Sequence, residues 1–246
     1  MKRKASKIIS LILALSLMLS MFTVNMFISA DTEPAIWDGS RTAPTSGSGT
    51  ASDPYKITNG SELAYVIVTG GGANTYYELT GDIYLNDIDK IDWATGEVDA
   101  GYTPNSWYEV WQIVTPSQLG GSDFQGTING KGHVVYGLYY EENPTTYETY
   151  CEGAALIPRV KKGGNATVLN LGMDYAYVHD NTTAAAFVAV TAGNDTTINI
   201  DSCYAGANVT LKSANAGAIR GYAGRFSDAS DLSCGGSITN CYSLAT

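Results

Sequence analysis

The amino-acid sequence predicts an all-β solenoid, a stack of short parallel strands with a short helix that caps its start. Two landmarks recur in the C-terminal third, the first in runs of small residues and the second at the head of short apolar segments. They are Leu156, Phe187 and Ile219, spaced by 31 and 32 positions, and Val168, Ile200 and Ile238, spaced by 32 and 38 positions. A period of about 30 residues, built from short apolar strands and Gly/Asn turns, is typical of a solenoid.

Stacking these units in parallel places equivalent residues above one another, about 4.8 Å apart. We therefore expect each set of landmarks to form one continuous inward row. Leu171, Cys203 and Cys241 also share one position of successive units, so both cysteines are expected to be reduced and to pack as small apolar side chains. A disulfide between Cys151 and Cys234 stays open as an alternative.

The segments before the repeats supply the remaining elements. Residues 31–53 are rich in Ser, Thr, Gly and Pro, which predicts a flexible linker or an extended edge. Residues 54–57 predict a strand, and residues 59–68 a helix with Asn59 or Ser61 as its N-cap. Strand alternation resumes over 76–87, residues 88–121 are irregular and Trp-rich, and 124–140 predict strands joined by tight glycine turns. The helix is placed to cover the open start of the stack.

The first 30 residues have the layout of a bacterial export signal. Lys2, Arg3, Lys4 and Lys7 precede an apolar run from residue 8 to residue 28, and the run ends in small residues that predict cleavage after Ala30. An uncleaved membrane anchor is the alternative, since about 20 apolar residues suffice to span a bilayer. The predicted localisation is secreted or cell-surface, without membrane insertion after cleavage.

The net charge of the chain indicates which classes of partner are unfavourable. Cleavage after Ala30 removes four of the 14 basic residues and none of the 24 acidic ones, which leaves a net charge of −14. Such a surface repels nucleic acid and anionic lipid, so neither is an expected partner.

Several segments carry a resemblance to a known family, in the order PYKITNGSELAYV, YYELTGDIYLN, FQGTINGKGHVVYGLYY and ITNCYS. Residues 37–246 resemble the secreted GLUG-repeat proteins of Gram-positive bacteria, whose repeats are similar to right-handed parallel β-helices. The resemblance implies such a β-helix over 54–246, with degenerate repeats of about 31 residues. The chain stops six residues after Asn240, in mid-unit and without a cap, so the repeats are expected to continue beyond residue 246. The resemblance implies modules of large surface proteins, including adhesins, and no catalytic residue. The Gly-rich run of the family is replaced here by residues 185–188 and 217–220.

The ionisable residues predict no catalytic centre. His133 and His179 lie at strand ends without a recognisable nucleophile, and the acidic residues 82, 87, 89 and 92 do not have the spacing of an EF-hand loop. A polysaccharide lyase would combine carboxylates with a basic residue, but the candidates do not repeat at one position of the units. They are Asp174, Asp195 and Asp201 with Arg159, Lys161 and Lys162. No metal and no cofactor is expected.

Aromatic residues give the functional lead. The chain has 17 tyrosines and only 5 phenylalanines, and amphipathic rings are used where one face is wet. Trp107, Tyr108 and Trp111 form the cluster predicted to bind glycans by stacking on sugar rings. The alternative is that the aromatic residues pack inward or cover turns.

Together these patterns predict a non-enzymatic exported module for adhesion, display or glycan binding. The expected partner is an extracellular polysaccharide or a glycan of a cell surface. The alternative function is that of a carbohydrate-active β-helix enzyme of the lyase or glycoside hydrolase type, which would need clustered ionisable groups with shifted pKa values in one groove.

Overall fold

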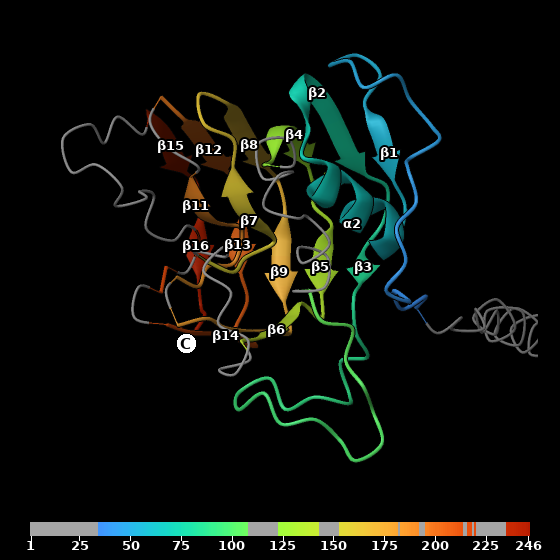
Figure 1. Ribbon diagram of the computed structural model, residues 1–246, viewed down its shortest axis with the longest axis vertical. Helices are drawn as coiled ribbons and strands as arrows, with labels where there is room; N and C mark the ends of the chain where they lie inside the picture. The colour runs from blue at the N-terminus through green and yellow to red at the C-terminus, as the bar shows by residue number, and fades with distance from the viewer. Residues whose placement is uncertain are drawn as a thin grey trace, which may run out of the picture. The chain divides into compact units, whose positions relative to one another are not determined.

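In the part of the chain that the structure describes, short strands that pair in parallel make up most of the regular structure, and one helix accompanies them (Figure 1). The computed structural model describes residues 34–107, 123–142, 153–181, 183–191, 195–213, 216–217, 219 and 235–246. Those from Ala35 onward form one unit. The elements are β1 Tyr55–Ile57, α2 Gly60–Thr69, β2 Gly71–Leu79, β3 Ile83–Tyr84, β4 Gln125–Asn129, β5 Val134–Tyr136, β6 Tyr139–Glu141, β7 Ile157–Val160, β8 Asn165–Leu169, β9 Gly172–Asp174, β10 Ala176–His179, β11 Val188–Thr191, β12 Thr197–Asp201, β13 Tyr204–Ala205, β14 Val209–Lys212, β15 Gly235–Thr239 and β16 Tyr242–Ser243. The predicted all-β class is therefore confirmed at this level.

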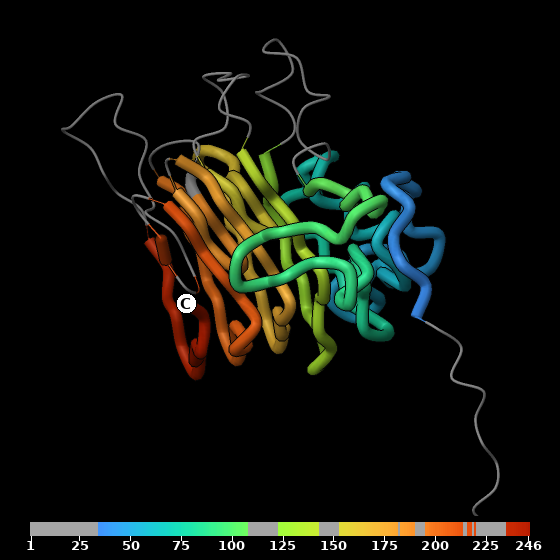
Figure 2. The backbone as a smooth tube through the Cα atoms, turned by 90° about the horizontal axis from the view of Figure 1, so that it is seen from below, coloured from blue at the N-terminus to red at the C-terminus, as the bar shows by residue number. Residues whose placement is uncertain are grey.

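Four sheets are built from these strands. A six-stranded sheet has the order β1-β2-β4-β8-β12-β15, and a five-stranded sheet has the order β16-β13-β9-β5-β3. A three-stranded sheet, β14-β10-β6, and a two-stranded sheet, β11-β7, complete the set. From β4 to β16 the chain visits the sheets in a recurring order, so that each pass lies beside the previous one (Figure 2).

The predicted row of Val168, Ile200 and Ile238 follows from the register of the six-stranded sheet. Ile200 is paired with Val168 on one side and with Ile238 on the other. The same position continues to Ile128 in β4 and to Tyr77 in β2. This row is confirmed, and its members in β4, β8 and β12 are fully buried.

The predicted row of Leu156, Phe187 and Ile219 is confirmed by backbone hydrogen bonds. The amide of Ile157 donates to the carbonyl of Phe187 at 2.8 Å, and the amide of Phe187 donates to the carbonyl of Ile219 at 3.2 Å. Leu156, which precedes Ile157, has no exposed surface, and neither does Phe187. Small residues flank this row, so the passing chains approach closely and the large side chains fill the interior.

A repeated left-handed residue makes the corner between the six-stranded and five-stranded sheets. Asn170, Ser202 and Asn240 have φ values of 49°, 55° and 54°. Asparagine tolerates this conformation better than most residues because its short polar side chain bonds locally. The Nδ2 of Asn170 donates to Oδ1 of Asn129 at 3.1 Å, and the Nδ2 of Asn240 donates to Oδ1 of Asp201 at 2.8 Å.

The predicted helix is confirmed as α2. Asn59 is the N-cap, with its side chain accepting a bond from the amide of Glu62, and Gly70 ends the helix in the left-handed conformation. Leu63, Val66 and Ile67 are buried in the main core. No helix within the described residues is long and apolar enough to cross a membrane.

Residues 35–53 lie along the first strands as an extended edge. The amide of Trp37 donates to the carbonyl of Tyr84 at 2.9 Å, and the amide of Lys56 donates to the carbonyl of Ser46 at 2.9 Å. The side chain of Trp37 is buried in the core. The outer edges of β1 and β3 are therefore covered by this segment.

Cys203 is buried as predicted, whereas Cys241, which was also expected to pack inside the core, is only partly covered. Backbone bonds from Tyr204 to Leu171 and from Tyr242 to Cys203 bring Leu171, Cys203 and Cys241 into one row. Both thiols are free, and Cys203 is fully buried. Cys241 is only half-buried, and it lies in the last layer of the described residues. Cys151 and Cys234 lie outside the described residues, so the alternative disulfide stays untested.

Cys203 is expected to resist alkylation in the folded protein. Burial raises the pKa of its thiol to about 12, so the reactive thiolate is rare at neutral pH. Peptide-resolved mass spectrometry after iodoacetamide treatment should find Cys203 modified only in denaturant, and Cys241 modified sooner. Cys203→Ala should cost on the order of a few kcal/mol or less through lost packing. A bridge between Cys203 and Cys241 in the non-reduced protein would contradict the core role.

Candidate functional site

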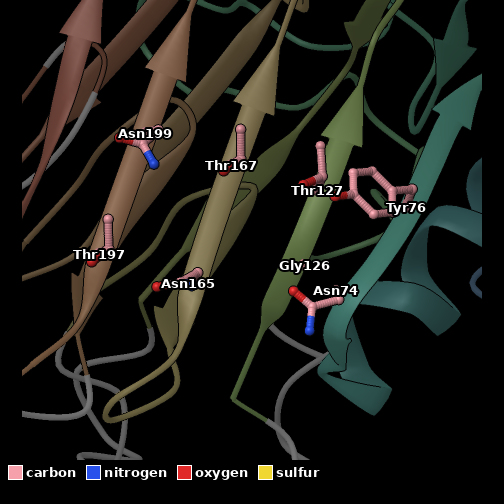
Figure 3. A pocket seen from close by; sticks show the side chains of 8 residues that line it. All are labelled: Asn74, Tyr76, Gly126, Thr127, Asn165, Thr167, Thr197 and Asn199. Carbon is pink, nitrogen blue, oxygen red and sulfur yellow. The ribbon is translucent and has the colours of Figure 1, made fainter. Parts of the chain in front are cut away.

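A shallow groove lies on the outer face of the six-stranded sheet (Figure 3). Its volume is about 320 Å³. Strands β2, β4, β8 and β12 supply its lining, so residues far apart in sequence meet there. The lining residues are Asn74, Tyr76, Gly126, Thr127, Asn165, Thr167, Thr197 and Asn199.

Strand alternation explains why the groove is polar. Ala166 and Val168 of β8 point into the core and have no exposed surface, and the residues between and beside them point outward. Register then aligns the outward residues across strands. Tyr76, Thr127, Thr167 and Asn199 occupy one line across β2, β4, β8 and β12. Asn165 and Thr197 are paired on a second line.

A bulge in β2 forms one wall of the groove. Gly71 pairs with Gln125 and Tyr76 with Thr127, so four residues of β2 stand opposite the single residue Gly126. The bulge lies directly over Gly126, where a Cβ atom would be 2.8 Å from the carbonyl oxygen of Thr75. Gly126 also has a φ of 124°, a conformation that other residues rarely adopt. A side chain at this position would push the wall away from the floor.

The chemistry of the lining is uniform. It consists of hydroxyls, amides and one phenol ring, and none of the eight residues is Asp, Glu, Lys, Arg or His. Asn and Thr each offer donors and acceptors. The groove is therefore suited to a neutral ligand rich in hydroxyl groups.

The predicted glycan-stacking cluster needs a correction at Trp107. This residue is only 2% exposed, its indole nitrogen donates to the carbonyl of Leu156 at 3.1 Å, and its ring meets Trp37 edge-on. Trp107 therefore fills the core and presents no face to a sugar. Tyr108 and Trp111 lie outside the described residues, so their role stays a prediction.

Six tyrosines of the described residues stack in three pairs across neighbouring layers. The ring centroids of Tyr84 and Tyr136 are 4.8 Å apart, and those of Tyr204 and Tyr242 are 5.2 Å apart in nearly parallel planes. Burial raises the pKa of Tyr136 to about 12, so its phenol stays protonated. The faces of these rings contact rings of the neighbouring layers. For these residues, this favours the alternative that the aromatic side chains serve packing and not glycan binding. Tyr76 is the one aromatic residue among the eight that line the groove.

A second apolar cluster covers the outer face of the three-stranded sheet. Ile91 and Trp93, from the irregular segment after β3, pack with the buried Tyr177 of β10. The ring centroids of Tyr139 and Tyr177 are 5.8 Å apart. Burial raises the pKa of Tyr177 to about 12. This irregular segment is thus a structural cover over the tyrosines.

The two histidines lie apart from the groove, each beside a carboxylate of a neighbouring layer. The Nδ1 of His133 is 3.3 Å from Asp82, and the Nδ1 of His179 is 2.8 Å from Glu141. All four side chains are about a third or more exposed. The sequence gives no sign of the pairing between His179 and Glu141, because it arises only from the register of β6 and β10.

The carboxylates considered for calcium or for lyase chemistry hold turns. The side chains of Asp87 and Asp92 accept from backbone amides two residues ahead, and Asp174 accepts from the amide of Asn208. Hydrogen bonds from Thr239 and Asn240 lower the pKa of the Asp201 carboxyl. Within the described residues, no three His, Cys, Asp or Glu side chains converge where they could hold a metal ion.

Of the three basic residues considered for lyase chemistry, Arg159 forms an ion pair. Arg159 is buried and lies 2.6 Å from the Asp123 carboxylate.

The chain was compared with protein-family models, curated proteins and solved structures, and none of them matches it.

Proposed function

We propose that this chain is a non-enzymatic exported module that binds a neutral polysaccharide along the outer groove of its six-stranded sheet. The observation that carries the proposal is the lining of that groove, which joins hydroxyls, amides and one aromatic ring from four strands and contains no charged residue. The cell or surface that carries the glycan is left to experiment.

The architecture that we propose for the module is a right-handed parallel β-helix. The parallel order of the four sheets and the recurrence of one inward row from β4 to β15 support this interpretation. In such a stack each layer offers the same outward positions, about 4.8 Å from the next. A polymer lying across the strands would meet these positions in succession.

The direction of the groove favours a chain molecule over a compact ligand. The line from Tyr76 through Thr127 and Thr167 to Asn199 crosses four strands, and the next residue on that line is Ser237 of β15. Hydroxyl and amide groups bond sugar hydroxyls, and Tyr76 offers a ring at one end of the line. We expect modest affinity because the groove is shallow and much of the ligand stays in water.

Export rests on the first 30 residues, which lie outside the described residues. Their basic start and apolar run remain the support for secretion or surface display. A net charge of −14, reached when four of the 14 basic residues are removed and all 24 acidic ones remain, disfavours acidic polysaccharides.

Binding is tested with the chain from Asp31 to Thr246 and soluble neutral polysaccharides. Affinity electrophoresis in gels containing xylan, β-glucan or galactomannan should show retardation by at least one of them, and none by polygalacturonate. The double variant Asn165→Ala/Thr167→Val should bind about fivefold more weakly or worse, because two hydrogen-bonding side chains are lost. Thr239→Val is the matched control, since Thr239 is an outward residue of the same sheet outside the groove.

Three results would overturn this proposal. They are no retardation by any neutral polysaccharide, equal binding by the double variant and the wild type, and shortening of the polymer during incubation. The last result would promote the alternative of a carbohydrate-active enzyme. Intact bacterial or host cells, assayed with the same variants, identify which surface carries the ligand.

A further inference from the structure

Two neighbouring strands of the groove carry the same pair of side chains in opposite order (Figure 3). Along β8 the lining residues are Asn165 and then Thr167, and along β12 they are Thr197 and then Asn199. On one line of outward positions Asn165 is paired with Thr197. On the other line Thr167 is paired with Asn199. The amide and the hydroxyl therefore exchange lines from one layer to the next.

The amide and the hydroxyl match different parts of a sugar. An asparagine side chain offers an acceptor oxygen and N–H donors side by side, so it matches two adjacent hydroxyls of one ring, whereas a threonine hydroxyl matches a single group. The hydroxyl of Ser237 donates to Oδ1 of Asn199 at 3.1 Å, and the Nδ2 of Asn199 is turned toward β8 (Figure 3). The N–H groups of Asn199 therefore face the middle of the groove.

A β-1,4-linked glucan has an alternation of the same kind. One edge of each glucose ring carries the adjacent hydroxyls of C2 and C3, and the opposite edge carries the hydroxymethyl group. In the extended chain, successive rings are turned over and advance by about one strand spacing. With one ring over β8 and the next over β12, the hydroxyl pair of the first ring faces Asn165 and that of the second ring faces Asn199. The two hydroxymethyl groups then face the threonines.

We propose that the groove is specific for a β-1,4-linked glucan, whose chain lies along the stack with successive rings over β8 and β12. This inference rests on the proposed polysaccharide-binding function and adds the linkage of the ligand. The α-1,4-linked and β-1,3-linked glucans consist of the same rings but wind into helices. Their hydroxyl pairs do not alternate between the two lines of the groove, so they match at most one layer at a time.

A titration of the ¹⁵N-labelled chain from Asp31 to Thr246, followed by NMR, compares three oligosaccharides that differ only in linkage. They are cellohexaose, maltohexaose and laminarihexaose, which are β-1,4-, α-1,4- and β-1,3-linked. We expect cellohexaose to bind at least about tenfold more tightly than the other two, because it keeps hydrogen bonds in both layers. It should also shift the side-chain amide signals of Asn165 and Asn199.

A swap of side chains tests the alternation without changing the composition of the groove. The double variant Thr197→Asn/Asn199→Thr gives β12 the order of β8, and it should bind cellohexaose about fivefold more weakly. The matched control adds Asn165→Thr/Thr167→Asn, which reverses both layers and restores the alternation. This fourfold variant should recover most of the affinity, and its recovery separates the effect of order from any effect on folding.

The inference is overturned if maltohexaose or laminarihexaose binds as tightly as cellohexaose, if the double variant binds like the wild type, or if the fourfold variant stays as weak as the double one. The failure of this inference is distinguishable from that of the proposed function. If a neutral polysaccharide retards the protein in gels and cellohexaose does not bind, only the assignment of the linkage is wrong. If no neutral polysaccharide binds, both proposals are wrong.

Discussion

Replacing Phe187 with alanine is expected to lower the free energy of unfolding by about 3–5 kcal/mol. The side chain of Phe187 has no exposed surface and lies in the row between Leu156 and Ile219. Its removal leaves a cavity at a level where the flanking residues of the same pass, Ala185 and Ala186, are too small to fill it. Each layer rests on its neighbours, so the loss weakens the contacts on both sides.

Urea unfolding followed by circular dichroism measures this effect. Tyr76→Ala is the control, since it also truncates an aromatic residue but at a half-buried outward position, and it should cost well below half as much. If Phe187→Ala lowers the free energy of unfolding by less than about 1 kcal/mol, this row does not contribute substantially to the stability of the core.

Arg159→Met is expected to destabilise the protein by a similar amount, about 3–5 kcal/mol at neutral pH. The guanidinium and the Asp123 carboxylate lie 2.6 Å apart with side-chain exposures of 8% and 7%. Removing the cation leaves a buried carboxylate whose remaining positive neighbour is Lys161, which has a smaller effect on its pKa than Arg159. The pair Lys56 and Glu78 is 2.7 Å apart but exposed by 29% and 22%, so Lys56→Met should cost only about 1 kcal/mol or less.

The pH dependence separates the charge effect from lost packing. Burial raises the pKa of Asp123, and Arg159 opposes that rise, so the pKa climbs further in the variant. A carboxyl whose pKa is higher in the folded than in the unfolded state favours folding most when it is protonated. This contribution to stability is lost as the pH rises through the folded-state pKa. The deficit of Arg159→Met should therefore shrink as the pH is lowered, and the double variant Asp123→Leu/Arg159→Met should recover much of the loss. An equal deficit at all pH values would assign it to packing alone.

The repeating part of the fold was predictable because the core selects apolar residues at fixed places. Val168, Ile200 and Ile238 were aligned by spacing alone, and the backbone pairs them as aligned. Asn59 and the apolar face of residues 59–68 predicted the helix for the same local reasons. Side chains that must be buried leave a period in the sequence, and short polar turns mark where each pass ends.

The candidate site was not predictable in the same way. Thr127, Thr167 and Asn199 have no signature beyond ordinary strand alternation, and they meet only through pairing between layers. The wall depends on a bulge of β2, which no pattern in residues 71–76 indicated. Trp107 misled because a large amphipathic ring in an irregular segment looks exposed, whereas its N–H finds the carbonyl of Leu156 inside the core. An alternation of polar residues across TIN, TVL and INI was the signal available for the groove.

The closed start of the stack gives folding a direction in time. Synthesis and the proposed export both deliver the N-terminal residues first, so the segment 35–53, α2 and β1 emerge before the later passes. Every subsequent strand of the six-stranded sheet pairs with one that is already in place, in the order β2, β4, β8, β12 and β15. The chain can thus grow on its own template, and a circularly permuted version that begins at β8 would have to form its layers before the surface on which they are laid.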